Sequence, residues 1–337
     1  MLLSPTQTRQ LFAHAFAHRY AILAINADSH AAVSDCLEAA RQADAPVIIE
    51  TSLWQIKGHS YGIGDPVLGV ARYLADLQVL AASPRYRQVP VVYHTDHIKG
   101  PETLAILQAA IQGVPTGLPG QSPLLCASSV SLDASDLSEA ENIATMRELC
   151  RLADEAGVAV ALEMESAVDD RITPRDETAR LIGGVESVYP GRIVLWAPGV
   201  GTQHGFTSDD GYSGFDPGIV AAHVGWLREL TGRDIGLALH GSTGLRADKL
   251  RAAAEQGVVK VNWSSESLHL RATALQRYVA EHAAQFDRKH KDWKATVMDH
   301  GLSTFVSREY VPFVAEKMVN LGAQGMGSAF MQAVDPV

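Results

Sequence analysis

The sequence is poor in cysteine, with only Cys36, Cys126 and Cys150 among its 337 residues. Their number is odd, their spacing is wide, and no two stand in a CxxC arrangement. This pattern argues against a disulfide framework and against a zinc site built from thiolates. We therefore expect a protein of a reducing compartment, and specifically a cytoplasmic one.

Long hydrophobic runs and clusters of basic residues are also missing. No apolar stretch approaches the roughly 20 residues that a membrane-spanning helix needs. The first segment, MLLSPTQTRQLFAHAFAHRY, has polar residues where a signal peptide requires an apolar core. The formal net charge is −10 and no segment is rich in Lys or Arg, which disfavours nucleic-acid binding through phosphates. We expect neither a membrane nor a nucleic acid as a partner.

Short apolar runs, in contrast, are frequent. Eight of them are rich in Val, Ile, Leu and Ala, namely residues 20–27, 45–52, 89–97, 123–133, 157–166, 192–205, 234–242 and 257–265. Such near-continuous apolarity is typical of strands that are buried on both faces of a parallel sheet.

Helical patterns separate most of these runs. Residues 29–45, 137–157 and 246–257 show helical spacing of Ala and Leu, and Ser138 with Glu141 forms a capping-box pattern. Eight strand–helix alternations predict an α/β fold, a (β/α)8 TIM barrel, with a doubly wound open sheet as the alternative. We expect a single barrel domain over residues 1–337, because no linker divides the chain.

Two polar segments interrupt the alternation, residues 166–191 and residues 205–217. Each follows a predicted strand, so we expect long loops at the C-terminal rim of the barrel, where long loops are usually functional. Solvated insertions without a function are the alternative.

Polar side chains stand where the apolar runs end. The run VPVVYHTDH closes with His94, Asp96 and His97, and His204 and His240 end two later runs. The other runs end in Asn26, Ser52, Asp133, Glu163, Glu165, Asn262, Ser264 and Ser265. In a barrel all these ends meet at the catalytic rim. His97, His204 and His240 would supply three imidazoles from three strands, and three imidazoles with an open position form a catalytic zinc site.

Glycines and hydroxyls follow the last three runs, in QHG (203–205), HGSTG (240–244) and NWSS (262–265). Glycine lets the backbone approach an anion closely. The loops after strands seven and eight are the usual phosphate site of a TIM barrel. We therefore expect a phosphorylated small molecule to bind beside the metal.

These motifs together resemble the class II, zinc-dependent ketose-bisphosphate aldolases of the fructose-1,6- and tagatose-1,6-bisphosphate type. The resemblance covers about residues 15–330. The segments that carry it are AINADSHAAVSDCLEAARQADAPVIIETS, VPVVYHTDH, SSVSLDASDLSEAENI, ALEME, GTQHG, HGSTG and GVVKVNWSSE.

The resemblance implies a (β/α)8 lyase of carbohydrate metabolism and glycolysis. It would cleave a fructose-1,6-bisphosphate-like ketose to dihydroxyacetone phosphate and an aldehyde through a zinc-stabilised ene-diolate. It implies a catalytic Zn²⁺ on His97, His204 and His240, and a second cation, divalent or monovalent, on Asp133 and Glu165. Asp96 would handle the proton of the C4 oxygen. The implied substrate-binding residues are Asn26, Ser52, Gly205, Gly241, Thr243, Asn262, Ser264, Ser265 and, for a second phosphate, Arg308. We also expect a homodimer or homotetramer.

The family has a further acid–base glutamate on a mobile loop. Glu186, in the GGVE context, is the residue we expect in that role, with Asp169, Asp170 and Glu177 as alternatives. The segment HGFTSDDGYSG lacks the lysine that the family often has there, and Ser242 and Trp263 replace smaller residues, which suggests an unusual ketose phosphate.

Three alternatives stay open. Lys260 could form a Schiff base, although a zinc Lewis acid removes the need for one. A barrel metallohydrolase or deaminase could use the three histidines to activate water, but the first run lacks the HxH that such enzymes usually have. A non-catalytic relative would keep the fold, yet the ligands are intact.

Overall fold

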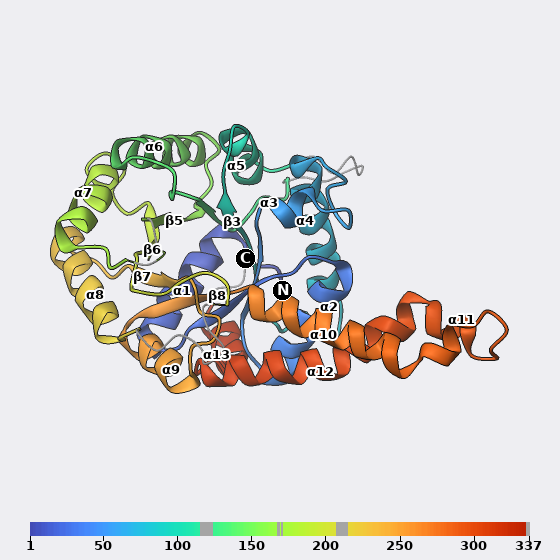
Figure 1. Cartoon of the computed structure of the whole chain (residues 1–337). Coiled ribbons are helices and arrows are strands. Elements are labelled where there is room, and N and C mark those ends of the chain that lie inside the picture. Colours follow the sequence, from blue (N-terminus) through green and yellow to red (C-terminus); the bar gives the residue numbers. More distant parts are fainter. Residues whose placement is uncertain (115–123, 167–168, 170, 207–214, 335–337) are drawn as a thin grey trace.

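Eight parallel strands close into a barrel surrounded by helices (Figure 1). This is seen in a computed structural model, which describes residues 1–114, 124–166, 169, 171–206 and 215–334. The strands are β1 (Ile22–Asn26), β2 (Val47–Thr51), β3 (Val91–Ile98), β4 (Ser129–Leu132), β5 (Ala161–Glu165), β6 (Ile193–Ala197), β7 (Gly236–Leu239) and β8 (Val258–Trp263). Each pairs with the next and β8 pairs with β1, which confirms the (β/α)8 barrel and excludes the open sheet.

The helices cover the outside of the barrel and shield its strands from water. They are α1 (Pro5–His18), α2 (His30–Ala43), α3 (Leu53–Lys57), α4 (Pro66–Ala82), α5 (Thr103–Gln112), α6 (Glu139–Glu155), α7 (Arg175–Glu186), α8 (Gly218–Thr231), α9 (Ala247–Gln256), α10 (Ser265–Glu281), α11 (Trp293–Val297), α12 (Asp299–Asn320) and α13 (Met326–Ala333). A short 3₁₀ turn spans Ala283–Phe286. None of the helices in the described part of the chain has both the length and the apolar character that a membrane crossing requires.

Local sequence signals set several helix ends. At the start of α6 the Ser138 hydroxyl accepts from the Glu141 amide, and the Glu141 carboxylate accepts from Ser138, which is the predicted capping box. Such a cap stabilises a helix start by about 1 kcal/mol. The far ends of α10 and α12, together with α11, project from the barrel as an arm (Figure 1).

The segment 166–191 differs from its prediction. It was expected to be a polar rim loop, but Arg175–Glu186 forms α7, which buries Leu181, Ile182 and Val185. Gly184 is a point of close contact between α7 and α6, because a Cβ there would lie 2.6 Å from Ile143 of α6. Of the other predicted rim loop, residues 207–214 lie outside the described part.

Candidate functional site

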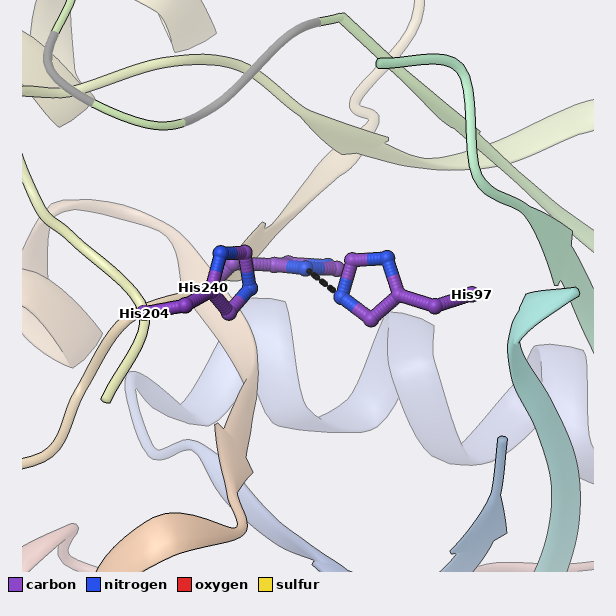
Figure 2. A group of neighbouring side chains, drawn as sticks. All are labelled: His97, His204 and His240. Atoms are coloured by element: carbon purple, nitrogen blue, oxygen red, sulfur yellow. Dashed lines mark hydrogen bonds between the residues drawn. The ribbon is translucent and has the colours of Figure 1, made fainter. Parts of the chain in front are cut away.

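Three imidazoles from three strand ends converge at the C-terminal rim (Figure 2). His97 belongs to β3, His240 follows β7, and His204 lies in the segment after β6. Their ring centroids are 4.7, 5.0 and 5.8 Å apart, and His240 Nδ1 lies 2.9 Å from His97 Nε2. One nitrogen from each ring lies within 4.8 Å of the other two. This arrangement can hold one cation between the three rings.

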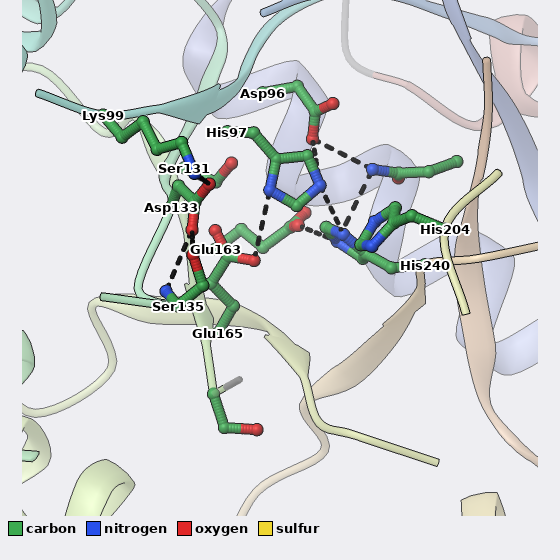
Figure 3. A network of polar contacts seen from close by, with 12 residues as sticks. Asp96, His97, Lys99, Ser131, Asp133, Ser135, Glu163, Glu165, His204 and His240 are labelled. Atoms are coloured by element: carbon green, nitrogen blue, oxygen red, sulfur yellow. Dashed lines mark hydrogen bonds and ion pairs between the residues drawn. The ribbon is translucent and has the colours of Figure 1, made fainter. Parts of the chain in front are cut away.

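Each of these imidazoles has a carboxylate at its other nitrogen, and Figure 3 shows Glu163 beside His240 and Glu165 beside His97. The pairs are His240 Nε2 with Glu163 Oε1 at 2.9 Å, His204 Nδ1 with Asp169 Oδ1 at 2.8 Å, and His97 Nδ1 with Glu165 Oε2 at 3.6 Å. Metal-ligating histidines commonly have such a carboxylate partner, which orients the ring and fixes its tautomer. The donor set therefore fits a bound transition metal.

The protonation state of His240 also suits a metal. Burial lowers the pKa of His240 to about 4, so this imidazole is neutral near pH 7 and has a free lone pair. Burial raises the pKa of Glu165 well above its ordinary value, and the neighbouring Glu163 and Asp133 carboxylates raise it further.

Asp96 lies beside the three histidines and is buried. The Asn262 amide donates to its Oδ1 at 2.9 Å, and the Asn26 amide donates to its Oδ2 at 3.4 Å. Burial alone would raise the pKa of Asp96, but His97 and the Lys260 ammonium outweigh burial and hold the pKa below its ordinary value. Asp96 is therefore an ionised carboxylate in contact with the cavity, able to accept a proton.

A layer of buried charge lies under the site. Lys260 Nζ is 2.9 Å from Glu163 Oε2, 3.4 Å from Glu50 Oε2 and 3.1 Å from His94 Nε2, and none of these four side chains reaches solvent. Desolvation would lower the pKa of Lys260, but Glu163 and Glu50 outweigh it and raise the pKa. A buried, protonated amine cannot attack a substrate carbonyl, which argues against the Schiff-base alternative.

A cavity of about 710 Å³ opens above the histidines. Its lining contains twelve residues predicted from the sequence: Asn26, Ser52, Asp96, His97, Asp133, His204, Gly205, Gly241, Thr243, Asn262, Ser264 and Ser265. His240 and Glu165 are buried beneath it.

The part of the cavity after β7 and β8 suits an anion. Gly241 has a φ of +64°, and a Cβ there would lie 2.5 Å from the Gln203 carbonyl oxygen, so the turn requires glycine. Helix α10 begins at Ser265, and in the described part of the chain its N-cap residue, Ser264, makes no side-chain cap hydrogen bond. Uncapped amide groups at the start of a long helix bind anions readily.

Two predicted site residues lie elsewhere. Glu186 is at the end of α7, where it accepts from the amides of Gly191 and Ile193 and pairs with Arg233 at 2.6 Å. Ile193 begins β6, so Glu186 stands at the opposite end of the barrel from the histidines, and its predicted role as the loop base is wrong. Arg308 is an exposed residue of α12 and is not part of the cavity lining.

The other acidic residues predicted for the site contact different partners. Glu177 is mostly buried in α7 and is paired with Arg171, whereas Asp169 contacts His204. Asp170 lies outside the described residues. Asp133 Oδ2 is 3.1 Å from the Lys99 ammonium, so a cationic group already stands beside it, and the second ion position stays a prediction.

Sequence reasoning gave no role to Glu50 and His94. Glu50 is a charged residue within the apolar run APVIIETS, as Lys260 is within GVVKVNW, and a charge inside a buried strand was the available signal. Trp54 was missed as well. It lines the cavity although the indole is 87% exposed.

The protein is thus a parallel (β/α)8 barrel with a candidate metal centre at its C-terminal rim. Three histidines form this centre, and each of them is paired with a carboxylate. The sequence model of the class-II fructose-bisphosphate aldolases matches residues 6–326. The chain belongs to this family.

Individual relatives agree with this assignment. The chain is 27% identical to a fructose-bisphosphate aldolase of Mycoplasma pneumoniae over 278 residues, which cover 80% of this chain and 83% of that protein. It is 28% identical to that of Candida albicans over 296 residues, with 80% of each covered. Among solved structures, the fructose-bisphosphate aldolase of Campylobacter jejuni superposes with a TM-score of 0.80 at 19% identity, covering 96% of both chains. The YdjI aldolase of Escherichia coli gives 0.68 at 20% identity, covering 97% of this chain and 100% of that one. At these identities the two structures support the fold.

Proposed function

We propose that this protein is a metal-dependent aldolase, a carbon–carbon lyase that reversibly cleaves a phosphorylated ketose to dihydroxyacetone phosphate and an aldehyde. The observation that carries this proposal is the group of His97, His204 and His240, each backed by a carboxylate, in a member of the aldolase family.

Zinc is the ion we propose for this group, because three imidazoles and an open position are its catalytic arrangement. When bound, a divalent cation acts as a Lewis acid that stabilises negative charge developing on the ketone oxygen. The carboxylates behind the imidazoles would orient the ligand nitrogens for such a cation. Asp133 and Glu165 remain our proposal for a second cation.

In this proposal the remaining residues of the site act on different parts of the substrate. Gly205, Gly241, Thr243, Ser264 and Ser265 offer amides and hydroxyls to the phosphate of the dihydroxyacetone half. Ionised Asp96 accepts the C4 hydroxyl proton during cleavage and returns it during condensation. Its two amide donors, from Asn26 and Asn262, hold it in place, and Ser52 lines the same cavity. In place of Glu186 we propose Asp169 as the residue that exchanges the C3 proton, since it is the described carboxylate of its segment that reaches the histidines.

The domain organisation, the cellular compartment and the oligomeric state of the enzyme are also part of the proposal. We infer a single barrel domain that works in the cytoplasm, which is consistent with three free cysteines, two of them buried. A homodimer or homotetramer is supported by exposed apolar side chains on the projecting arm, among them Phe286, Trp293 and Met298.

The test is an assay of zinc-loaded protein against ketose phosphates, with released dihydroxyacetone phosphate followed by its enzymatic reduction. The wild type should release it, and His240→Ala should not, while the exposed His300→Ala serves as the matched control and should remain active. Release of inorganic phosphate or another hydrolysis product, without dihydroxyacetone phosphate, would instead indicate a metallohydrolase.

A further inference from the structure

We propose that the half of the substrate that leaves as the aldehyde carries no phosphate, and that Trp54 contacts this half. The inference rests on the proposed aldolase function. It narrows the substrate class to ketose 1-phosphates whose distal end is uncharged. Three observations support it: the charges that line the cavity, the composition of the segments near it, and the exposed indole at its edge.

The cavity has two chemically different sides. The side after β7 and β8 presents glycines and hydroxyls to an anion. The other side is formed by α3, which follows β2, and by the chain after β3. In the closed barrel β3 and β7 stand across from each other. A ketose held by its C1 phosphate beside β7 and β8, and spanning the histidines, extends its distal carbons toward α3.

The cations on that distal side are each paired with a carboxylate. Among the described lining residues the permanently charged cations are Lys57 and Lys99, and none is an arginine. Lys57 Nζ lies 2.8 Å from the Glu102 carboxylate. Lys99 Nζ lies 3.1 Å from Asp133, which itself lines the cavity. No unpaired guanidinium or ammonium of the described lining is left for a second phosphate.

The segments outside the described structure cannot supply the missing cation. Residues 115–123, 167–168, 170, 207–214 and 335–337 contain no Lys, Arg or His. They do contain Asp170, Asp209, Asp210 and Asp335. Whatever positions these residues take, this chain adds carboxylates and no cation. A phosphate dianion brought next to carboxylates without a cationic partner meets like-charge repulsion and an uncompensated loss of solvation.

An uncharged polyhydroxy end fits the side chains that are present. Trp54 lines the cavity with its indole 87% exposed, and Leu53 lies next to it in α3. A large exposed aromatic at the edge of a binding site offers an apolar face to the C–H groups of a sugar, together with one N–H donor. The structure gives this indole no hydrogen-bond partner among the described residues, so its donor is available.

The test compares two acceptors in the condensation direction, because this avoids differences in ring closure between ketose phosphates. Zinc-loaded enzyme receives dihydroxyacetone phosphate with either glyceraldehyde or glyceraldehyde 3-phosphate, each as both enantiomers. Consumption of dihydroxyacetone phosphate gives kcat/KM for the acceptor. We expect glyceraldehyde to be favoured by at least about tenfold, the size of a modest like-charge penalty.

Two variants sharpen the comparison. Trp54→Ala should raise the KM for glyceraldehyde more than the KM for dihydroxyacetone phosphate, and Trp54→Phe should restore most of the loss. Glu102→Gln removes the partner of Lys57, so it should improve the use of glyceraldehyde 3-phosphate relative to glyceraldehyde. Val79→Ala, which removes an exposed apolar side chain of α4 that is not part of the cavity lining, is the control and should leave both KM values unchanged.

The outcomes separate the two proposals. If glyceraldehyde 3-phosphate is used as well as glyceraldehyde or better, the inference is wrong and the aldolase proposal stands. If neither aldehyde condenses and no ketose phosphate is cleaved, the aldolase proposal fails and the inference fails with it. If glyceraldehyde is preferred but Trp54→Ala affects both KM values equally, the assignment of Trp54 is wrong.

Discussion

The Nε2 atom of His240 lies 2.9 Å from Glu163 Oε1, and this contact leaves the Nδ1 atom of His240 facing His97. Glu163 in turn contacts the Lys260 ammonium through its other oxygen at 2.9 Å. A buried lysine and a buried glutamate thus determine which nitrogen of the histidine is offered to a metal. Metal binding at the C-terminal rim therefore depends on two charged side chains, Lys260 and Glu163, that are fully buried.

Glu163→Gln tests whether this carboxylate positions His240. Glutamine has nearly the same shape but accepts the imidazole N–H less strongly, so zinc affinity should fall by about 10- to 100-fold. Competition with a chromophoric chelator measures this, and Glu141→Gln, at an exposed helix cap, is the matched control. Unchanged zinc affinity in Glu163→Gln would show that the contact does not orient the ligand.

Lys260→Met should lower the free energy of unfolding, an effect that activity assays alone would not measure. Removing the ammonium leaves the Glu163 carboxylate buried without its cation, a change that typically costs about 3–5 kcal/mol. The free energy of unfolding from urea titration measures it, with the exposed Lys289→Met as control.

The double variant Lys260→Met/Glu163→Gln adds a second check. Because the two side chains contact each other, its loss of stability should be smaller than the sum of the two single losses. Additive losses would mean that the ion pair is not the reason for the destabilisation.

Asp96→Asn separates acid–base chemistry from metal binding. Asp96 Oδ1 is 3.9 Å from His97 Nε2 and already accepts a hydrogen bond from Asn262, so it stands beside the three-histidine group. We expect the variant to retain its zinc and to lose about 10²- to 10⁴-fold in cleavage rate, the usual contribution of a positioned acid or base. Elemental analysis showing loss of zinc would identify Asp96 as a ligand.

His223 makes stability depend on pH far from the site. Its ring is buried between α8 and β6, where Trp196 donates to its Nδ1 at 3.4 Å, and burial lowers its pKa from 6.5 to about 4. Between these pH values the unfolded chain binds a proton that the native chain does not. This contribution to stability is therefore complete above pH 6.5 and is lost as the pH falls toward 4, by up to roughly 3 kcal/mol.

Urea titrations at pH 7 and pH 5 test the effect of His223. The His223→Gln variant should be less stable than the wild type at pH 7 but should lose less stability on going to pH 5. The exposed His59→Gln should behave as the wild type does. An equal pH dependence in His223→Gln and wild type would contradict the assignment.

The barrel was predictable because buried parallel strands are apolar over their whole length. Each of the eight runs coincides with a strand, although β3 extends one residue beyond its run, and the histidines that end three of the runs meet at one rim. Helix α7 was missed because its buried face is short and lies among charged residues and two glycines. Glu186 was misplaced for the same reason: once residues 175–186 are helical, its side chain is carried to the far end of the barrel.

The contacts beneath the site could not be predicted. The sequence shows a charge within the runs of β2 and β8, but which charges meet depends on strand register and on which face of the sheet each residue takes. Lys260 contacts Glu50 and Glu163 across the barrel interior, and the spacing of these residues along the chain does not predict the contacts. The contact between Asp169 and His204 could not be predicted either, since the two residues are 35 positions apart and no sequence pattern links them.

Removal and return of the metal tests the central claim most directly. Protein stripped by a chelator should cleave no ketose phosphate, and activity should return in proportion to added zinc and saturate near one ion per chain. His240→Ala should remain inactive across the same titration, and borohydride added with substrate should leave no lysine adduct. Full cleavage by metal-free protein, or a substrate trapped on a lysine, would contradict the account.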